Sequence, residues 1–298
     1  MYTPLVSIIV LTYQHENYIE DCIKGLLSQT YTNMELLIAD DASTDATLNI
    51  IDRNLMELNK KFVRVEIIRH PENTGNIAHN INELLKTAKG EYFRLSAGDD
   101  ALLPDCVETL VEYLETNKED VLVYSNAFIV PDTWHIGKSF MKNTIYTKTY
   151  EPPSFENAFS TLIERNYVAS PTIMIRSSVY KKYGYYDEEL KQDDWDMLLK
   201  LARKEKFGYV NKVLTYYRKS QTSVSNSNTR RKFVDGYNFR VNVLNKYLRY
   251  VEKDKRIAIK KAVMDLYIKM AIQKKYYDYA MILLLRRYKL YIVGKIWY

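Results

Sequence analysis

The feature that most constrains the fold is a regular alternation of short apolar segments with segments of helical periodicity. A near-continuous apolar run at residues 6–11 predicts a strand buried on both faces, and further strands are predicted at residues 34–39, 63–68, 92–95 and 121–124. Between them, apolar residues recur at spacings of three and four, which is typical of helices with one core face. This order predicts right-handed crossovers and a parallel sheet with helices on both faces.

Polar side chains follow the carboxyl ends of the first four predicted strands. They are residues 12–14 after the first strand, Asp40 and Asp41 after the second, residues 73–76 after the third, and Asp99 and Asp100 after the fourth. In such sheets, ligands bind beyond the carboxyl ends of the strands, near the point where strand order reverses. The sequence therefore predicts a nucleotide-binding crevice at this edge.

The turn after the first strand excludes two common phosphate-binding loops. Residues 12–16 read T-Y-Q-H-E, without a G-x-G-x-x-G, and the chain contains no G-x-x-x-x-G-K-[ST]. Phosphate charge must then be met by a metal, a helix N-terminus or an arginine. A nucleotidyltransferase on a similar sheet is disfavoured too, because its usual glycine-rich basic loop is missing here.

The adjacent carboxylates of Asp99 and Asp100 repel each other when both are ionised, so they favour a positive partner. A divalent cation carrying a phosphorylated ligand is one such partner, because Mg and Mn prefer oxygen ligands. The alternative is a solvated acidic turn in front of the helix that Pro104 is predicted to open.

Several features bear on the cellular compartment. Cys22 and Cys106 lie on apolar faces of predicted helices, which indicates core residues in a reducing compartment. The first basic residue is Lys24, so a signal peptide is not expected. The longest aliphatic run, residues 280–285, is too short to span a bilayer. We predict a cytoplasmic protein, with peripheral association at the inner face of the cell membrane as an option.

Seven segments follow one another in order over about residues 4–225. They are V-S-I-I-V-L-T-Y, L-S-Q-T-Y, I-A-D-D-A-S-T-D, N-T-G-N-I-A-H-N-I-N, G-E-Y-F-R-L-S-A-G-D-D-A-L-L-P, Y-Y-D-E-E-L-K-Q-D-D-W-D-M and Y-Y-R-K-S-Q-T-S-V-S. This series resembles the inverting family-2 glycosyltransferases, which have the GT-A fold. The resemblance implies an α/β, GT-A-type nucleotide-sugar-binding domain with a mostly parallel central sheet flanked by helices. We assign residues 1–228 to it, with a nucleotide-binding half (1–100) and an acceptor half (101–228).

The resemblance also implies which residues contact the nucleotide sugar. They are Leu11, Thr12, Tyr13, Asp41, Asn76, Asn80, Asp99 and Arg218. Residues 11–13 would hold the nucleobase, and Asp41 would accept a hydrogen bond from it. Arg218 falls in the Y-R element near the diphosphate, and Asp99 matches the metal-ligating second acid of the D-x-D element, with Asp100 beside it.

The implied reaction is an inverting transfer from a nucleoside diphosphate sugar, UDP-sugar by default, to a hydroxyl of a glycan or lipid-linked glycan. A divalent Mn or Mg ion would stabilise the leaving diphosphate. Asp194 matches the general base, with Asp193 as first reserve, and its place near a helix N-terminus predicts an ionised carboxylate. For either acid alone, capping of that helix is the alternative role.

The sequence departs from the family pattern at two positions. Ala97 occupies the place of the first D-x-D acid, and Ser220 the place where a histidine often follows the arginine. Both departures favour an alternative, a catalytically impaired member that binds nucleotide sugar or glycan. The pair Asp193 and Asp194 argues against it, because a pure binder has little need of a base.

The last 70 residues differ from the rest in charge. Residues 229–298 contain 18 Lys and Arg against 5 Asp and Glu, whereas residues 1–228 contain 25 against 32. Basic residues beside tyrosines and Trp297 on amphipathic helices favour docking on an anionic membrane surface near a lipid-linked acceptor. The alternative is packing on the catalytic domain or on a second subunit in a homo-oligomer. No nucleic-acid-binding motif accompanies the basic charge, so we expect no nucleic-acid partner.

Overall fold

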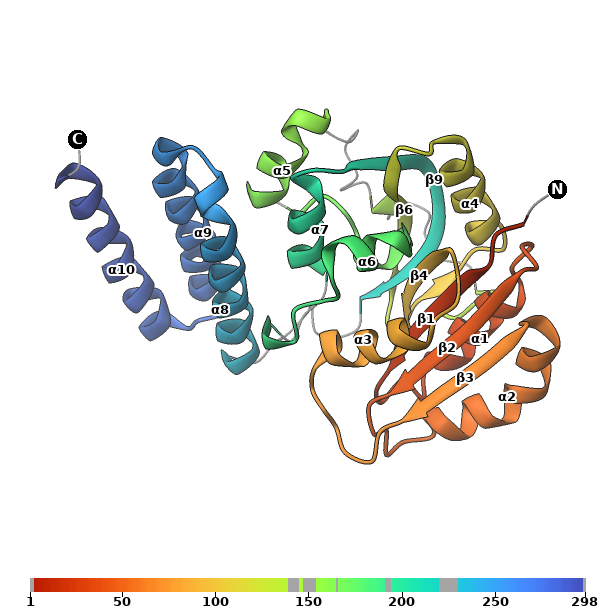
Figure 1. The fold of residues 1–298 in the computed structure, drawn as a ribbon. Coiled ribbons are helices and arrows are strands. Elements are labelled where there is room, and N and C mark those ends of the chain that lie inside the picture. Colours follow the sequence, from red (N-terminus) through yellow and green to blue (C-terminus); the bar gives the residue numbers. More distant parts are fainter. Residues whose placement is uncertain are drawn as a thin grey trace. The chain divides into compact units, whose positions relative to one another are not determined.

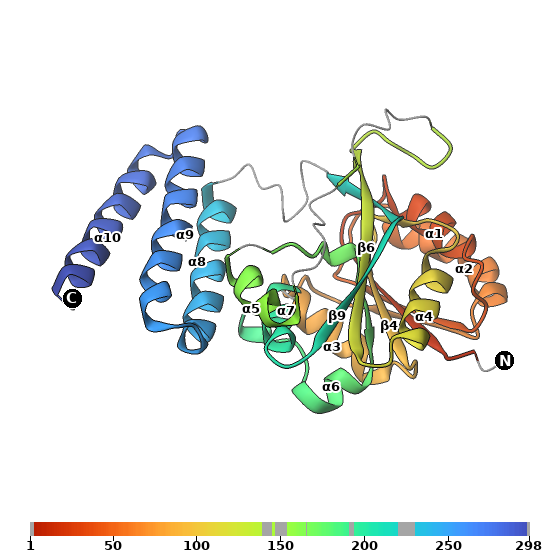
Figure 2. The same cartoon turned by 90° about the horizontal axis from the view of Figure 1, so that it is seen from above.

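The computed structural model describes residues 3–138, 145–146, 154–164, 166–190, 194–219 and 230–296 (Figures 1 and 2). The chain forms two compact units, Met1–Ser223 and Val224–Tyr298. The boundary predicted after residue 228 falls in the segment 220–229, which lies outside the described residues.

One half of the central sheet is parallel, as the apolar runs predict. Its strands lie in the order β3 (Arg64–Arg69), β2 (Met34–Asp40), β1 (Val6–Thr12) and β4 (Tyr92–Ala97), and each pair of neighbours is parallel. β1 and β2 are buried along almost their whole length. Their Val, Ile and Leu side chains therefore fill the core on both faces of the sheet.

The other half of the sheet is mixed. β8 (Met174–Arg176) inserts antiparallel between β4 and β6 (Asp120–Pro131), and β9 (Lys206–Lys219) then runs parallel to β6. The short β5 (Ala101–Leu102) and β7 (Ile145–Tyr146) pair with β9 and β6. The single sheet thus runs through both halves predicted for residues 1–228.

The sequence predicts two separate strands at residues 207–210 and 213–217, but the structure has the single strand β9 there, so this prediction was wrong. β9 continues through Asn211 and Lys212, where its register against β6 shifts around Asn126. A bulge of this kind absorbs extra residues without ending the ladder, so the polar pair does not act as a turn.

Helices cover both faces of the sheet (Figure 2). α1 (Ile19–Leu27), α2 (Thr47–Lys61) and α4 (Cys106–Thr116) lie on one face, and their apolar side chains share a core with Ile8 and Val10 of β1. The elements on the other face are α3 (Ile77–Thr87), α5 (Phe155–Glu164), α6 (Ser178–Tyr183) and α7 (Asp194–Ala202), with the short 3₁₀ turns Ser170–Thr172 and Glu188–Leu190.

The close approach of α1 to β5 requires a glycine. A Cβ atom on Gly25 would lie 2.7 Å from the backbone nitrogen of Leu102 and 2.9 Å from its oxygen. Because backbone atoms would have to move, we expect Gly25→Ala to lower the free energy of unfolding by about 1–3 kcal/mol in urea titrations. Gly236→Ala is the matched control, because its Cβ would meet nothing closer than 4.0 Å. Equal midpoints for wild type and Gly25→Ala would contradict this account.

The second unit is helical, as its periodicity predicts. It consists of α8 (Arg230–Tyr247), a 3₁₀ turn (Leu248–Tyr250), α9 (Lys253–Gln273) and α10 (Tyr277–Ile296). Its interior contains an aromatic cluster made by Phe233, Tyr237, Tyr267, Tyr276 and Tyr279. Within the described residues, no helix is both long enough and apolar enough to cross a bilayer.

Candidate active site

The polar segments that follow β1, β2 and β4 lie at one edge of the sheet. The parallel register places Thr12 opposite Asp40 and Leu11 opposite Ala97. Beyond the ladder, the nitrogen of Asp41 donates to the oxygen of Thr12 at 2.9 Å. The register therefore confirms that the strand ends predicted to form the crevice meet.

Hydrogen bonds between two turns stiffen this edge. The carboxylate of Asp40 accepts from the nitrogen and the hydroxyl of Ser43, at 2.8 and 2.6 Å. The nitrogen of Gln14 donates to the Ser43 hydroxyl at 2.9 Å, and the nitrogen of His15 donates to that of Thr47 at 2.8 Å. The turn after β1 is therefore fixed against the turn after β2 before any ligand binds.

Three of the eight predicted nucleotide-contacting residues hold the loop before α3. The Asp41 carboxylate accepts from the nitrogens of Thr74 and Gly75, at 2.8 and 3.1 Å. Asn80 is buried and accepts from the Thr74 hydroxyl at 2.9 Å, and Asn76 caps α3 by accepting from the nitrogen of His79 at 3.2 Å.

The residues at the end of β1 differ in exposure. Leu11 is half-buried and Thr12 is buried, whereas Tyr13 is 44% exposed. Tyr13 therefore presents an aromatic ring at the edge of the sheet, where a flat base could stack.

The two adjacent acids occupy different environments. Asp100 is buried, and its Oδ1 accepts from the backbone nitrogen of Arg218 at 2.9 Å. Burial raises the pKa of Asp100 well above its usual value, and the neighbouring charge of Asp99 adds to this. Asp99 is only half-buried, and its carboxylate has no hydrogen-bonding or ionic partner among the described residues. Asp99 is thus the member of the pair that can take an external ligand.

Arg218 is enclosed by protein groups and is only 1% exposed. Its Nη2 pairs with the buried Asp21 of α1 at 3.0 Å, and its Nε donates to the carbonyl of Asp99 at 3.0 Å. Its Nη1 donates to the carbonyls of Pro131, Asp132 and Trp134. All its nitrogens therefore have partners inside the fold, and its link to the site is the hydrogen bond to the backbone carbonyl of Asp99.

Sequence reasoning missed Asp21 and His15. Asp21 accepts from Arg218, from His135 at 2.9 Å and from the nitrogen of Ile136 at 3.0 Å, so it fixes the segment after β6. Nothing in the sequence distinguishes it from an ordinary acid in a first helical turn. His15 could have been identified from the sequence, because it lies in the turn after the first predicted strand, where site residues are expected.

His15 lies close to the acids of the crevice. Its Nδ1 is 3.2 Å from the Thr12 hydroxyl, and a Cβ atom on Gly98 would lie 2.7 Å from it. Burial lowers the pKa of His15, although the nearby carboxylates of Asp99, Asp45 and Asp40 counteract this. The imidazole is therefore held neutral beside Asp99 near pH 7.

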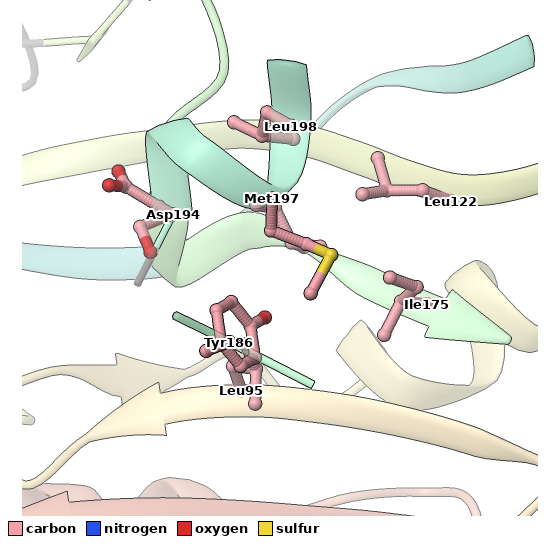
Figure 3. A pocket seen from close by; sticks show the side chains of 9 residues that line it. Leu95, Leu122, Ile175, Tyr186, Asp194, Met197 and Leu198 are labelled. Atoms are coloured by element: carbon pink, nitrogen blue, oxygen red, sulfur yellow. The ribbon is translucent and has the colours of Figure 1, made fainter. Parts of the chain in front are cut away.

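Asp194 begins α7 and lines an apolar cavity (Figure 3). The other lining residues are Leu95, Leu122, Ser170, Ile173, Ile175, Tyr186, Met197 and Leu198. Asp194 Oδ1 accepts from the nitrogen of Trp195 at 2.7 Å, and Oδ2 lies 3.5 Å from Nδ2 of Asn166.

Two effects act in opposite directions on the pKa of Asp194. Backbone hydrogen bonds at the start of α7 do favour the ionised form, but burial dominates and raises its pKa above the usual value. A raised pKa brings a carboxylate closer to the strength that a general base needs near neutral pH. Asp193 and Ser220 lie outside the described residues.

Helix α3 connects the nucleotide-side loop to the segment that leads to Asp194. Asn82 donates to the carbonyl of Tyr186 at 2.9 Å and accepts from its nitrogen at 3.0 Å. Glu188 Oε1 accepts from Asn82 at 2.8 Å, while its carbonyl accepts from Asn76 at 3.0 Å. His79 Nδ1 lies 3.0 Å from Glu188 Oε2. These contacts make α3 a common support for both predicted parts of the site.

A metal ion fits this site only where protein and substrate both supply its ligands. Among the described residues, no group of three or more His, Cys, Asp or Glu side chains is arranged to hold an ion. Mg and Mn are often bound by one or two carboxylates together with substrate phosphates. The unpartnered carboxylate of Asp99 suits that arrangement, whereas the buried Asp100 does not.

Solved structures with the same fold support this architecture. The chain matches Staphylococcus aureus TarS 1-349 in complex with UDP-GlcNAc with a TM-score of 0.61, at 20% identity, covering 97% of this chain and 92% of that one. It also matches the mannosyltransferase PcManGT from Pyrobaculum calidifontis in complex with GDP-Man and Mn2+, with a TM-score of 0.61 at 14% identity, covering 99% and 88%. These likenesses show the GT-A fold.

Sequence relatives carry transferase names. The chain is 31% identical over 223 residues to the UDP-Glc:alpha-D-GlcNAc-diphosphoundecaprenol beta-1,3-glucosyltransferase WfaP of Escherichia coli, which covers 74% of this chain and 80% of that protein. It is 30% identical over 182 residues to an uncharacterized glycosyltransferase of Haemophilus influenzae, which covers 60% of this chain and 54% of that protein. The chain thus spans about half the length of this second relative.

The family model described as Glycosyl transferase family 2 matches residues 7–184. That span runs from β1 to the end of α6, and it includes the strand ends that form the crevice together with Asp99. The structure also has the α/β sheet flanked by helices that the resemblance implies, and the half-buried Asp99 lies just beyond the end of β4. On this match and these relatives, the chain belongs to glycosyl transferase family 2.

Proposed function

We propose that the chain transfers a sugar from a nucleoside diphosphate sugar to a hydroxyl of a glycan or lipid-linked glycan, with inversion at the anomeric carbon. The observation that carries the proposal is the half-buried, unpartnered carboxylate of Asp99 at the edge where β1, β2 and β4 end. The names of sequence relatives and of solved structures with the same fold, which include UDP-Glc, UDP-GlcNAc and GDP-Man, support a nucleoside diphosphate sugar as the donor. They leave the base open, and UDP is our default.

In this proposal Asp99 binds a divalent Mn or Mg ion together with the diphosphate of the donor. When bound, the ion supplies positive charge to the leaving diphosphate. Asp100 then acts from inside the fold, because its hydrogen bond to the nitrogen of Arg218 shapes the turn that presents Asp99. Arg218 holds the carbonyl of Asp99 from the same side.

The donor base would stack on Tyr13 and lie against the loop that Asp41 holds. Asp41 uses both carboxylate oxygens on the nitrogens of Thr74 and Gly75, and each oxygen retains a lone pair for a base N–H. Asn76 and Asn80 would contribute by fixing this loop. The nucleotide site is therefore ordered before the donor arrives, which limits the entropy lost on binding.

Asp194 would remove the proton from the acceptor hydroxyl as that oxygen attacks the anomeric carbon. The carbon–oxygen bond to the acceptor forms while the bond to the diphosphate breaks, so a single displacement inverts the centre. Burial raises the pKa of Asp194, which strengthens it as a base. Asp193 is the reserve for this role.

Metal removal tests the assignment of Asp99. We expect EDTA to abolish transfer and Mn to restore it, and Asp99→Asn to lower the Mn-dependent rate on the order of 10²-fold, because the ion loses its protein ligand. The Mn dependence of UDP binding, measured by calorimetry, should weaken in the same variant. Asp105→Asn is the control, since that acid pairs with Lys212 at the surface.

Hydrolysis of the donor in the absence of acceptor distinguishes an enzyme from a protein that only binds nucleotide sugar. Metal-dependent hydrolysis of donor sugars without acceptor is expected for the wild type, in a panel of UDP, GDP and dTDP sugars. Tight donor binding without any turnover would favour the catalytically impaired alternative. Full activity of Asp99→Asn in EDTA would overturn the metal assignment.

A further inference from the structure

Helix α10 has an apolar face that the rest of its unit leaves uncovered. The residues of this outer face are Tyr277, Met281, Ile282, Leu284, Leu285 and Tyr288, and their exposed fractions lie between 42% and 62%. A different set on the same helix, Tyr279, Ala280 and Leu283, is buried. Tyr279 packs on the rings of Phe233 and Tyr237, so the inner face already supplies the packing that holds α10 in place.

The outer face is continuous along the helix. Tyr277, Met281, Leu284 and Tyr288 recur at spacings of four, three and four, which places them on one side of an α-helix. Large exposed apolar residues in the described part of the first unit are spread over α2 and separate loops, as Tyr13, Met56, Val63 and Tyr185 show. A contiguous exposed apolar face of this kind marks an interaction surface.

Basic residues border the outer face. Arg286 follows Ile282 by one turn, Lys289 follows Leu285 by one turn, and both are exposed. Arg287 lies apart from them, because it pairs with Asp265 of α9. Unit 224–298 as a whole contains 18 Lys and Arg against 5 Asp and Glu.

We propose that the outer face of α10 docks on the surface of an anionic lipid bilayer, with the helix lying along the surface. Apolar side chains would enter the boundary between headgroups and acyl chains while Arg286 and Lys289 contact lipid phosphates, which is the binding mode of interfacial amphipathic helices. The positive charge of unit 224–298 favours an anionic bilayer over a second copy of the chain as the partner of this face. Two copies joined through α10 would bring together two units with the same strong positive charge, whereas anionic lipid neutralises it.

Vesicle flotation of the full chain tests the proposal. We expect flotation with vesicles of phosphatidylcholine and phosphatidylglycerol, weaker flotation with phosphatidylcholine alone, and weakening by salt. Met281→Glu combined with Leu285→Glu should lower partitioning at least about tenfold, because charges replace buried apolar groups. Arg286→Glu combined with Lys289→Glu should lower it on anionic vesicles only. Met56→Glu in α2, at another exposed methionine, is the matched control and should float like wild type.

Two results would overturn the proposal. One is equal flotation of the Met281→Glu, Leu285→Glu variant and wild type. The other is absence of wild-type flotation together with a dimer in light scattering that this variant dissociates, which would identify a second copy as the occupant. Transfer to a soluble acceptor is measured on the same samples. The proposal does not rest on the proposed reaction, so loss of flotation with unchanged transfer separates the two.

Discussion

Asp194→Asn is expected to lower the rate of sugar transfer by about 10²–10⁴-fold, the usual contribution of general-base catalysis. Asn has nearly the same shape and retains an oxygen that can accept from the nitrogen of Trp195, so α7 should still begin at this residue. Donor affinity should remain unchanged, because the nucleotide loop is held by other residues. Steady-state kinetics and calorimetry with UDP measure the two quantities.

The pH profile distinguishes a base from a structural acid. Burial raises the pKa of Asp194, so the wild-type rate should fall as pH decreases through that raised value, and Asp194→Asn should lack this acid limb. Glu189→Gln, which removes an exposed acid from the preceding segment, should leave both rate and profile unchanged. Full activity of Asp194→Asn combined with an inactive Asp193→Asn would transfer the role to Asp193.

Arg218→Met is expected to lower the free energy of unfolding by about 3–5 kcal/mol, because it leaves the carboxylate of Asp21 buried without its charged partner. It also removes the donor to the carbonyls of Pro131, Asp132, Trp134 and Asp99. Urea denaturation measures the change. Arg69→Met is the matched control, because its pair with Asp52 is about half exposed on both sides and should contribute about 1 kcal/mol or less.

This experiment also decides between two roles for Arg218. If Arg218 binds the diphosphate directly, Arg218→Met should lower the affinity for the donor and leave the free energy of unfolding unchanged. If Arg218 instead has a structural role inside the fold, Arg218→Met should lower the free energy of unfolding, and Asp21→Asn should reproduce most of that loss. A stable Arg218→Met protein with weakened UDP binding would support the diphosphate contact that family resemblance implies.

The apolar patterns predicted the first half of the fold well. Uninterrupted Val, Ile and Leu runs admit few interpretations, and β1 and β2 lie where those runs do. The place of β8 between β4 and β6 was not predictable, because a strand of three residues carries little pattern of its own. The bulge in β9 was missed because Asn211 and Lys212 have the composition of a turn.

At the candidate site, residue types were predictable but their partners were not. Asp99 and Asp100 are chemically identical in sequence, yet one is buried against the nitrogen of Arg218 and the other keeps an unpartnered carboxylate. The identity of Asp21 as the counter-ion depends on a contact between residues 197 positions apart. Such long-range pairs leave no trace in local spacing, so burial and pairing had to come from the three-dimensional structure.

The hydrogen bonds of Asn82 and Asn76 with Tyr186 and Glu188 bear on how this loop can be exchanged between family members. A loop exchanged between family members at residues 185–190 would arrive without the α3 amides that fit its backbone. Chimaeras should therefore exchange α3 and this loop as one module. Where only the loop is grafted, Asn82 should be retained and residue 188 kept as Glu.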